Sequence, residues 1–265
     1  MDFTVDGKRA FAYTAAHALD PAKRTALFVH GAGLDHSWWG LQSRWFGYHG
    51  WNVLAVDLPG HGRSGGPPIA TVEAMADWVM RLLDAAGLGR AAVVGHSMGS
   101  LVAVECAARH AARVERIALL GAAYPMKVGD AFLEAAKKNE TTAFDMSTIW
   151  GHAPQVPLGG NPNPGMWMYG DNLARLARLA PGVLHNDLLA CHQYAGGEAG
   201  AAKTACPVLF ILGNRDQMTA PRVAAGFAKA FKSAQTVLLP PSGHSMMAEA
   251  PDATLDALAA FLNQE

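Results

Sequence analysis

The apolar positions of the chain fall into short, nearly continuous runs and do not alternate with polar residues. Strands that are covered on both faces have this pattern, which is typical of parallel sheets. Near the start of the chain, residues 3–5 and 10–14 flank Asp6-Gly7, a dipeptide that favours a tight hairpin turn. We therefore predict a sheet that opens with a hairpin and continues through the apolar runs at 26–29, 53–56, 91–94, 117–120, 208–212 and 236–239.

Helical patterns lie between these runs. Residues 71–86 begin at Thr71, a good N-cap, and stop at Gly87, a common residue after a helix. Pro251 suits the first turn of a final helix. Strand and helix alternate, which predicts an α/β fold with a mostly parallel sheet and helices on both faces. The other helices are expected at 98–110, 220–231 and 251–262.

The alternation stops between about residues 124 and 204. This segment contains GGNPNPGMWMYG (159–170) and several helical patches, but no convincing strand. It is too long for a simple connection between two strands. We interpret it as a helical lid, or cap, at 124–203, inserted into a core formed by residues 1–123 and 204–265.

The composition excludes several classes of partner. The 265 residues are 51% hydrophobic and 16% charged, which is enough for a substantial core. The net charge of −1 and the lack of a basic run argue against nucleic acid and anionic membranes as partners. No secretory pattern or run long enough to span a bilayer is found, so we expect a cytoplasmic protein with a small-molecule substrate. A homo-oligomer is compatible with the sequence.

No pattern in the chain indicates a metal or a cofactor. The three cysteines lack metal-site spacing and are expected to be small buried hydrophobes. Residues 60–65 match G-x-G-x-x-G, but Gly-Pro-Pro follows at 66–68, where a dinucleotide site needs a helix to begin. His185 and His192 lack a third ligand at suitable spacing. The cysteines are Cys106, Cys191 and Cys206.

Residues 95–99 read Gly-His-Ser-Met-Gly, the form G-x-S-x-G, between a predicted strand and a predicted helix. So sharp a turn strains the backbone at its apex, and the glycines on either side relieve the crowding. Ser97 then projects from the carboxyl end of the sheet, where open α/β folds bind ligands. Ser97 is therefore a candidate nucleophile, which a base must activate.

The base and its supporting acid are predicted from their positions after strands. His244 lies in a loop after the last predicted strand, and Asp216 follows the strand at 208–212. The order Ser97, Asp216, His244 is the order that accompanies this type of turn. In such a triad the histidine takes the serine proton, while the carboxylate fixes the imidazole tautomer and stabilises its charged form.

Two backbone N–H groups are candidates for holding the anion that forms during acyl transfer. The N–H of Met98 lies at the start of a helix, where donors are unpaired and the dipole favours negative charge. His-Gly-Ala-Gly follows a strand at 30–33, and its small residues permit close approach to a reacting carbon. We assign the second donor to Ala32, with Gly33 as the alternative.

The motifs together resemble the α/β-hydrolase superfamily, in its serine-nucleophile esterase and hydrolase branch. The resemblance implies an eight-stranded core, a lid after the sixth strand and no cofactor. Haloalkane dehalogenases and epoxide hydrolases carry aspartate where this chain has Ser97, so those branches do not fit. The motifs are HGAG (30–33), DLPGHGRS (57–64), GHSMGS (95–100), GNRD (213–216) and SGH (242–244).

Aromatic residues and methionines in the loops around the site predict an apolar substrate pocket, with contacts from Gly33, Trp38, Trp167 and Met246. The economical function is a carboxylesterase that cleaves small to medium, mainly apolar carboxylic esters through an acyl-enzyme on Ser97. Three alternatives stay open. They are a C–C bond hydrolase of meta-cleavage-type dienoates, a lactonase or perhydrolase with the same triad, and a ligand receptor that retains the triad.

Overall fold

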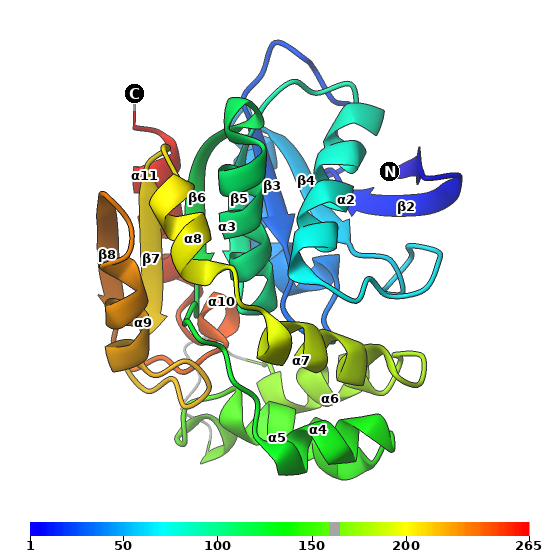
Figure 1. The fold of residues 1–265 in the computed structure, drawn as a ribbon, viewed down its shortest axis with the longest axis vertical. Helices are drawn as coiled ribbons and strands as arrows, with labels where there is room; N and C mark the ends of the chain where they lie inside the picture. The colour runs from blue at the N-terminus through cyan, green and yellow to red at the C-terminus, as the bar shows by residue number, and fades with distance from the viewer. Residues whose placement is uncertain (159–164, 265) are drawn as a thin grey trace.

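The computed structural model describes residues 1–158 and 165–264, which contain one eight-stranded sheet (Figure 1). The spatial order of the strands is β1-β2-β4-β3-β5-β6-β7-β8. The β1–β2 and β2–β4 pairs are antiparallel, and the other pairs are parallel. The predicted α/β fold is thus confirmed. In chain order the strands are β1 (Asp2–Val5), β2 (Lys8–Tyr13), β3 (Thr25–Val29), β4 (Asn52–Asp57), β5 (Ala91–His96), β6 (Val114–Leu120), β7 (Val208–Gly213) and β8 (Ala234–Leu239).

Helices cover both faces of the sheet because successive strand side chains point to opposite faces. In β3, Leu27 belongs to the core cluster on one face, whereas Phe28 belongs to the cluster on the other. Leu27 and Phe28 are both fully buried, which explains the unbroken apolar runs. The first face is covered by α2 (Val72–Ala85), α3 (Met98–Arg109) and α9 (Pro221–Ala228), and the second by α1 (Gly40–Tyr48) and α11 (Pro251–Leu262).

The described part of the segment between β6 and β7 contains helices joined by loops, and no strand. Four of its helices gather beyond the carboxyl end of the parallel strands (Figure 1) and share a small apolar cluster of their own. This arrangement matches an inserted helical lid, and the limits 124–203 remain a prediction. The four helices are α4 (Asp130–Lys137), α5 (Thr141–Trp150), α6 (Met168–Leu176) and α7 (Val183–Gln193).

The fifth helix of the segment, α8 (Gly197–Lys203), lies apart from the other four. It runs beside α3 on the face of the sheet (Figure 1), and its Ala201 belongs to the core cluster there. A Cβ atom at Gly200 would lie 2.9 Å from Val104 of α3, so the glycine permits this close approach. The packing of α8 therefore belongs to the sheet layers, although the sequence pattern grouped it with the lid.

No helix in the described part of the chain is both long enough and apolar enough to cross a membrane. All three cysteines are free thiols. Cys106 and Cys191 are buried, and burial raises the pKa of the half-buried Cys206 thiol to about 11.

Candidate active site

Ser97 sits at a strained turn between β5 and α3. Its backbone dihedrals, a φ of 52° and a ψ of −117°, lie outside the regions that residues other than glycine ordinarily adopt. Its N–H donates to the carbonyl of Leu120 on the neighbouring strand at 2.8 Å. A Cβ atom added to Gly95 would lie 2.0 Å from the nearest backbone oxygen, and one added to Gly99 would lie 2.3 Å from another. Only glycine therefore fits at either position. The turn has the geometry that the motif predicts, with the serine at its apex.

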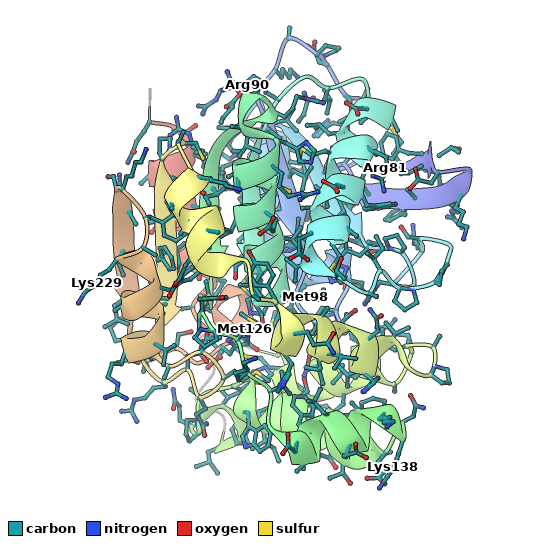
Figure 2. All side chains as sticks on the ribbon, in the orientation of Figure 1. Arg81, Arg90, Met98, Met126, Lys138 and Lys229 are labelled. Atoms are coloured by element: carbon teal, nitrogen blue, oxygen red, sulfur yellow. The ribbon has the colours of Figure 1, made fainter. Side chains whose placement is uncertain are left out.

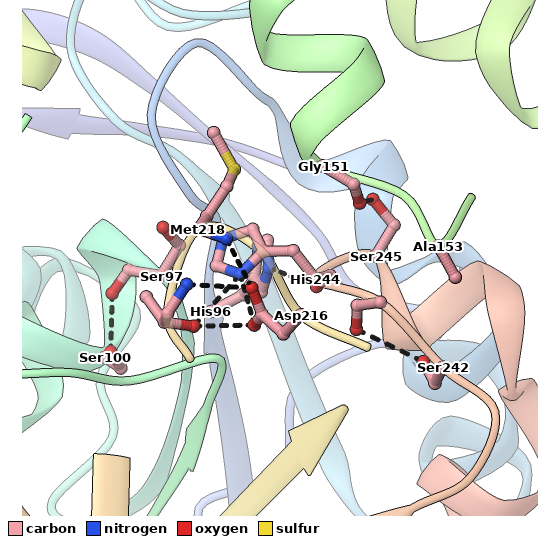
Figure 3. A network of polar contacts seen from close by, with 12 residues as sticks. His96, Ser97, Ser100, Gly151, Ala153, Asp216, Met218, Ser242, His244 and Ser245 are labelled. Carbon is pink, nitrogen blue, oxygen red and sulfur yellow. Dashed lines mark hydrogen bonds and ion pairs between the residues drawn. The ribbon is translucent and has the colours of Figure 1, made fainter. Parts of the chain in front are cut away.

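The loops after β7 and β8 bring Asp216 and His244 together (Figure 3). The Nδ1 atom of His244 lies 2.8 Å from Oδ2 of Asp216, and both side chains are buried. Because Nδ1 donates to the carboxylate, the other nitrogen of the imidazole is left free to exchange a proton. This is the pairing of base and acid that the order of the motifs predicts.

Asp216 is held as a carboxylate by four donors. Besides His244, it accepts hydrogen bonds from the N–H of Met218, the N–H of Thr219 and the Thr219 hydroxyl, at 2.6–2.8 Å. Burial alone would raise the pKa of Asp216. The charge of His244 and these hydrogen bonds outweigh burial and lower the pKa to about 2.

His96, the residue before the serine, contacts the backbone of His244. Its Nε2 atom donates to the carbonyl of His244 at 3.0 Å, and the two rings lie 4.7 Å apart. Burial, followed by the nearby charge of His244, lowers the pKa of His96 well below its usual value, so the ring is neutral. The sequence motif gave no sign of this contact, because the two residues are 148 positions apart.

Ser97 and His244 open onto one cavity of about 240 Å³ between the sheet edge and the helices α4–α7. Figure 2 shows Met126, which lines this cavity, where the helices α4–α7 meet the sheet core. Arg90, Lys138 and Lys229 lie at the periphery of the molecule. Most of the lining is apolar, and Lys127 is the one charged side chain among the described lining residues. The apolar walls include Leu34, Trp38, Phe132, Leu184 and Leu188.

The two expected anion donors have no acceptor within the part of the chain that the structure describes. The N–H of Met98 opens α3, where no carbonyl of the helix can reach it, and Ala32 lines the cavity. The alternative, Gly33, is not available, because its N–H donates to Oδ2 of Asp187 at 2.9 Å. The geometry therefore favours Ala32 over Gly33.

Of the four expected substrate contacts, the structure places only Trp38 in the lining of the cavity. Met246 is fully buried in the core on the sheet face that α1 and α11 cover, because α10 (Met246–Glu249) packs there after the His244 loop. Trp167 is 74% exposed and borders a separate hollow. Gly33 lies under α6 and α7, and its N–H is occupied. These positions do not support the expectation for Gly33, Trp167 or Met246.

Glu249 is a member of the site that the sequence reasoning missed. Its buried carboxylate accepts the N–H groups of Gly243 and Ser245, on either side of the base, at 3.0 and 3.1 Å. It also accepts the N–H of Ala153, in the segment that follows α5, at 3.0 Å. Glu249 thus fixes the loop of His244. A glutamate ahead of a predicted helix gave no signal of this role.

One cluster could be considered for a metal ion. Side-chain atoms of Asp35, His36 and Asp57 lie within 4.8 Å of one another. However, Nδ1 and the N–H of His36 already donate to Asp57, and the N–H of Arg63 donates to the second oxygen of Asp57. The cluster is held together by its own hydrogen bonds and lies outside the cavity lining.

Comparison with known proteins agrees with the fold. The model of the α/β-hydrolase family matches residues 26–257. The chain belongs to this family and is an α/β-hydrolase enzyme.

Individual relatives differ in their reactions. A pimeloyl-(acyl-carrier protein) methyl ester esterase of Neisseria meningitidis is 29% identical over 201 residues, 74% of this chain and 77% of that protein. An (E)-2-((N-methylformamido)methylene)succinate hydrolase of Acinetobacter baylyi is 23% identical over 242 residues, 89% of each chain. The crystal structure of an enol-lactonase from Burkholderia xenovorans superimposes over the whole of both chains with a TM-score of 0.86 at 23% identity.

Proposed function

We propose that this α/β-hydrolase is a serine hydrolase that cleaves small to medium, uncharged, mainly apolar carboxylic esters through an acyl-enzyme on Ser97. The observation that carries the proposal is that His244, hydrogen-bonded to Asp216, lines the same mostly apolar cavity as the strained serine.

The proposed reaction begins when the free imidazole nitrogen of His244 takes the hydroxyl proton of Ser97 and Oγ attacks the ester carbonyl. The N–H groups of Ala32 and Met98 hold the oxyanion, and each such donor contributes about 10²–10³ to the rate. The intermediate then expels the alcohol, which takes the proton from His244. Water, activated by the same nitrogen, next attacks the acyl-enzyme, and the acid leaves as Ser97 regains its proton.

The cavity supports the proposed substrate class. Its apolar walls favour an uncharged acyl group, and its volume of about 240 Å³ lies below the range of about 300–1,000 Å³ that is usual for drug-sized ligands. The one charged lining residue, Lys127, already donates from Nζ to the carbonyl of His192 at 2.8 Å. No arginine lines the cavity in the described residues, so paired recognition of a carboxylate is not provided.

A second candidate is a lactone or dienoate substrate that bears a carboxylate. Lys127, at the exposed rim of the cavity, favours it, since the ammonium has donors beyond the one that His192 uses. The names of the enol-lactonase and the succinate hydrolase point the same way. On this reading, Lys127→Met would raise KM for acidic substrates and leave neutral esters unaffected.

The deciding experiment compares purified wild type, Ser97→Ala and the exposed control Ser233→Ala on three sets of compounds. These sets are p-nitrophenyl esters from acetate to octanoate, neutral lactones, and carboxylate-bearing lactones or dienoates. We expect many turnovers of the short neutral esters by wild type and Ser233→Ala, and none by Ser97→Ala. Faster turnover of the acidic compounds would favour the second candidate. Release of a single equivalent followed by arrest would favour a receptor, and full activity of Ser97→Ala would exclude the acyl-enzyme.

A further inference from the structure

A buried ion pair lies beneath the loop that carries the oxyanion donor. Asp187, on α7, is fully buried, and its Oδ2 atom accepts from Nε2 of His61 at 2.8 Å and from the N–H of Gly33 at 2.9 Å. The second oxygen of Asp187 accepts from the amide of Asn186 at 3.2 Å. One carboxylate thus joins the helical segment, the loop after β4 and the loop after β3.

The hydrogen bonds of His61 require it to be an imidazolium. Its Nε2 atom faces the Asp187 carboxylate, and its Nδ1 atom faces the carbonyl of Pro59 at 3.1 Å. Both partners only accept hydrogen bonds, so both ring nitrogens must carry protons. Burial alone would lower the pKa of His61, but the Asp187 carboxylate raises the pKa above its ordinary value.

The neighbouring His30, whose ring lies 4.8 Å from that of His61, is neutral for the opposite reason. Its Nε2 atom accepts the N–H of Leu58 at 3.1 Å, so only Nδ1 carries a proton, which it donates to the carbonyl of Gly31 at 2.8 Å. Burial, together with the charge of His61, lowers the pKa of His30 to about 4.

These contacts fix both peptide planes next to Ala32. The carbonyl of Gly31 is held by His30, and in a planar trans peptide the N–H of Ala32 points the opposite way. The following peptide is held through the N–H of Gly33, which binds Asp187. Gly33 has a φ of +68°, and a Cβ atom there would lie 2.9 Å from Leu184 of α7. The orientation of Ala32 thus depends on His30 and Asp187, neither of which lines the cavity.

We propose that Asp187 and His61 are positioning residues. Through a charged pair that spans the helical segment and the core, they hold the oxyanion loop, residues 30–33, in its catalytic conformation. The inference rests on the proposed function, because it assigns the oxyanion to Ala32.

The inference also predicts an alkaline limit to catalysis. His61 faces Asp187, Asp57 and the neutral His30, and its charge is present at and below its ordinary pKa of 6.5. As the pH rises through the raised pKa of His61, one of its two hydrogen bonds is lost and the loop loosens.

The test uses Asp187→Asn and His61→Gln, with His110→Gln as the matched control. His110 forms a similar pair with Asp77, at 2.7 Å, on a partly exposed surface outside the cavity lining. We expect kcat for p-nitrophenyl butyrate to fall about 10- to 100-fold in the two buried variants, with KM changed less than about threefold. Inhibition by an alkylboronic acid, whose adduct with serine carries the oxyanion, should weaken in the same proportion. The double variant should be no worse than Asp187→Asn alone, since both remove one interaction.

Two readouts separate positioning from a general loss of folding. The alkaline decline of kcat in the wild type should be absent from His61→Gln, and exchange of the Gly33 amide proton should accelerate in both variants but not in His110→Gln. The exchange measurement stands even if no ester is hydrolysed, which would overturn the proposed function alone. If Asp187→Asn does not fold, His61→Gln carries the test. Unchanged kcat, unchanged boronate inhibition and unchanged amide exchange in folded variants would overturn the positioning role.

Discussion

The carboxylate of Asp216 holds the imidazole of His244 through a hydrogen bond of 2.8 Å between Oδ2 and Nδ1 across 28 positions of sequence. The bond fixes which nitrogen of the ring faces the cavity. In the proposed reaction it also compensates the charge that the ring gains when Ser97 loses its proton. The pKa of Asp216, lowered to about 2, keeps this carboxylate ionised at any pH at which the enzyme would act.

Replacing Asp216 with Asn should therefore reduce kcat about 10,000-fold while the protein stays folded, because the amide favours the wrong tautomer of His244. The rate on p-nitrophenyl butyrate and the far-UV circular dichroism spectrum would be measured together. Asp252→Asn, at an exposed position in the first turn of α11, is the control and should behave as wild type. Near-normal turnover by a folded Asp216→Asn would mean that another carboxylate supports the base.

Local patterns were sufficient to predict the parts of the site that depend on local geometry. The turn at Ser97 requires glycines two positions away on either side, and Asp216 and His244 each follow a strand of the parallel sheet. The carboxyl ends of such strands meet at one edge. Chain order and strand ends therefore predicted that these three residues share one edge of the sheet, without knowledge of any long-range contact.

Residues that act through distant backbone contacts could not be found in this way. Glu249 and Asp187 lie on helices whose patterns are unremarkable, and their partners are 96 and 154 residues away in sequence. Trp167 shows the opposite failure. Its neighbours in sequence suggested a pocket, but the packing of the helical segment turns it toward solvent. Such cases depend on how separate elements pack, which hydrophobic periodicity does not encode.

Glu249 provides a prediction for pH dependence. Replacing it with Gln leaves one of the three N–H groups without an acceptor, at a cost of about 1–3 kcal/mol in the free energy of unfolding. Burial raises the pKa of Glu249 above its ordinary 4.5, although its N–H donors oppose this. A carboxyl with a raised pKa stabilises the fold most when it is protonated, below pH 4.5, and less as the pH rises through the folded-state pKa.

The uncharged Gln lacks this dependence. The destabilisation caused by Glu249→Gln should therefore be larger below pH 4.5 than above the raised pKa. Urea unfolding of both proteins across this pH range measures the difference directly. Glu140→Gln, at an exposed position before α5, should show no such trend. A difference that is constant with pH would mean that the buried carboxyl is ionised as easily as an exposed one.

The glycines of the serine turn should tolerate no side chain. In Gly99→Ala the added Cβ would lie 2.3 Å from the carbonyl oxygen of Val29 and 2.7 Å from that of His30, both on backbone that cannot move freely. We expect a loss of about 3 kcal/mol in the free energy of unfolding. Gly226, inside α9, has no atom within 4 Å of such a Cβ, so Gly226→Ala should stabilise the protein by about 1 kcal/mol. Equal melting temperatures for the two variants would contradict the close packing of α3 on the end of β3.

The length of acyl chain that the enzyme accepts should be set by the helical segment. Leu188, on α7, lines the cavity and is only 6% exposed. Leu188→Phe would shorten the cavity without adding charge, so kcat/KM for p-nitrophenyl octanoate should fall about tenfold or more, since one methylene in an apolar pocket is worth about 10- to 200-fold. Activity on the acetate should change less than about threefold, because a two-carbon acyl group does not reach the narrowed end. Leu238→Phe, on the exposed side of β8, controls for the added ring. An equal loss for acetate and octanoate would place the acyl chain elsewhere, whereas a loss confined to octanoate would identify α7 as the end wall of the acyl pocket.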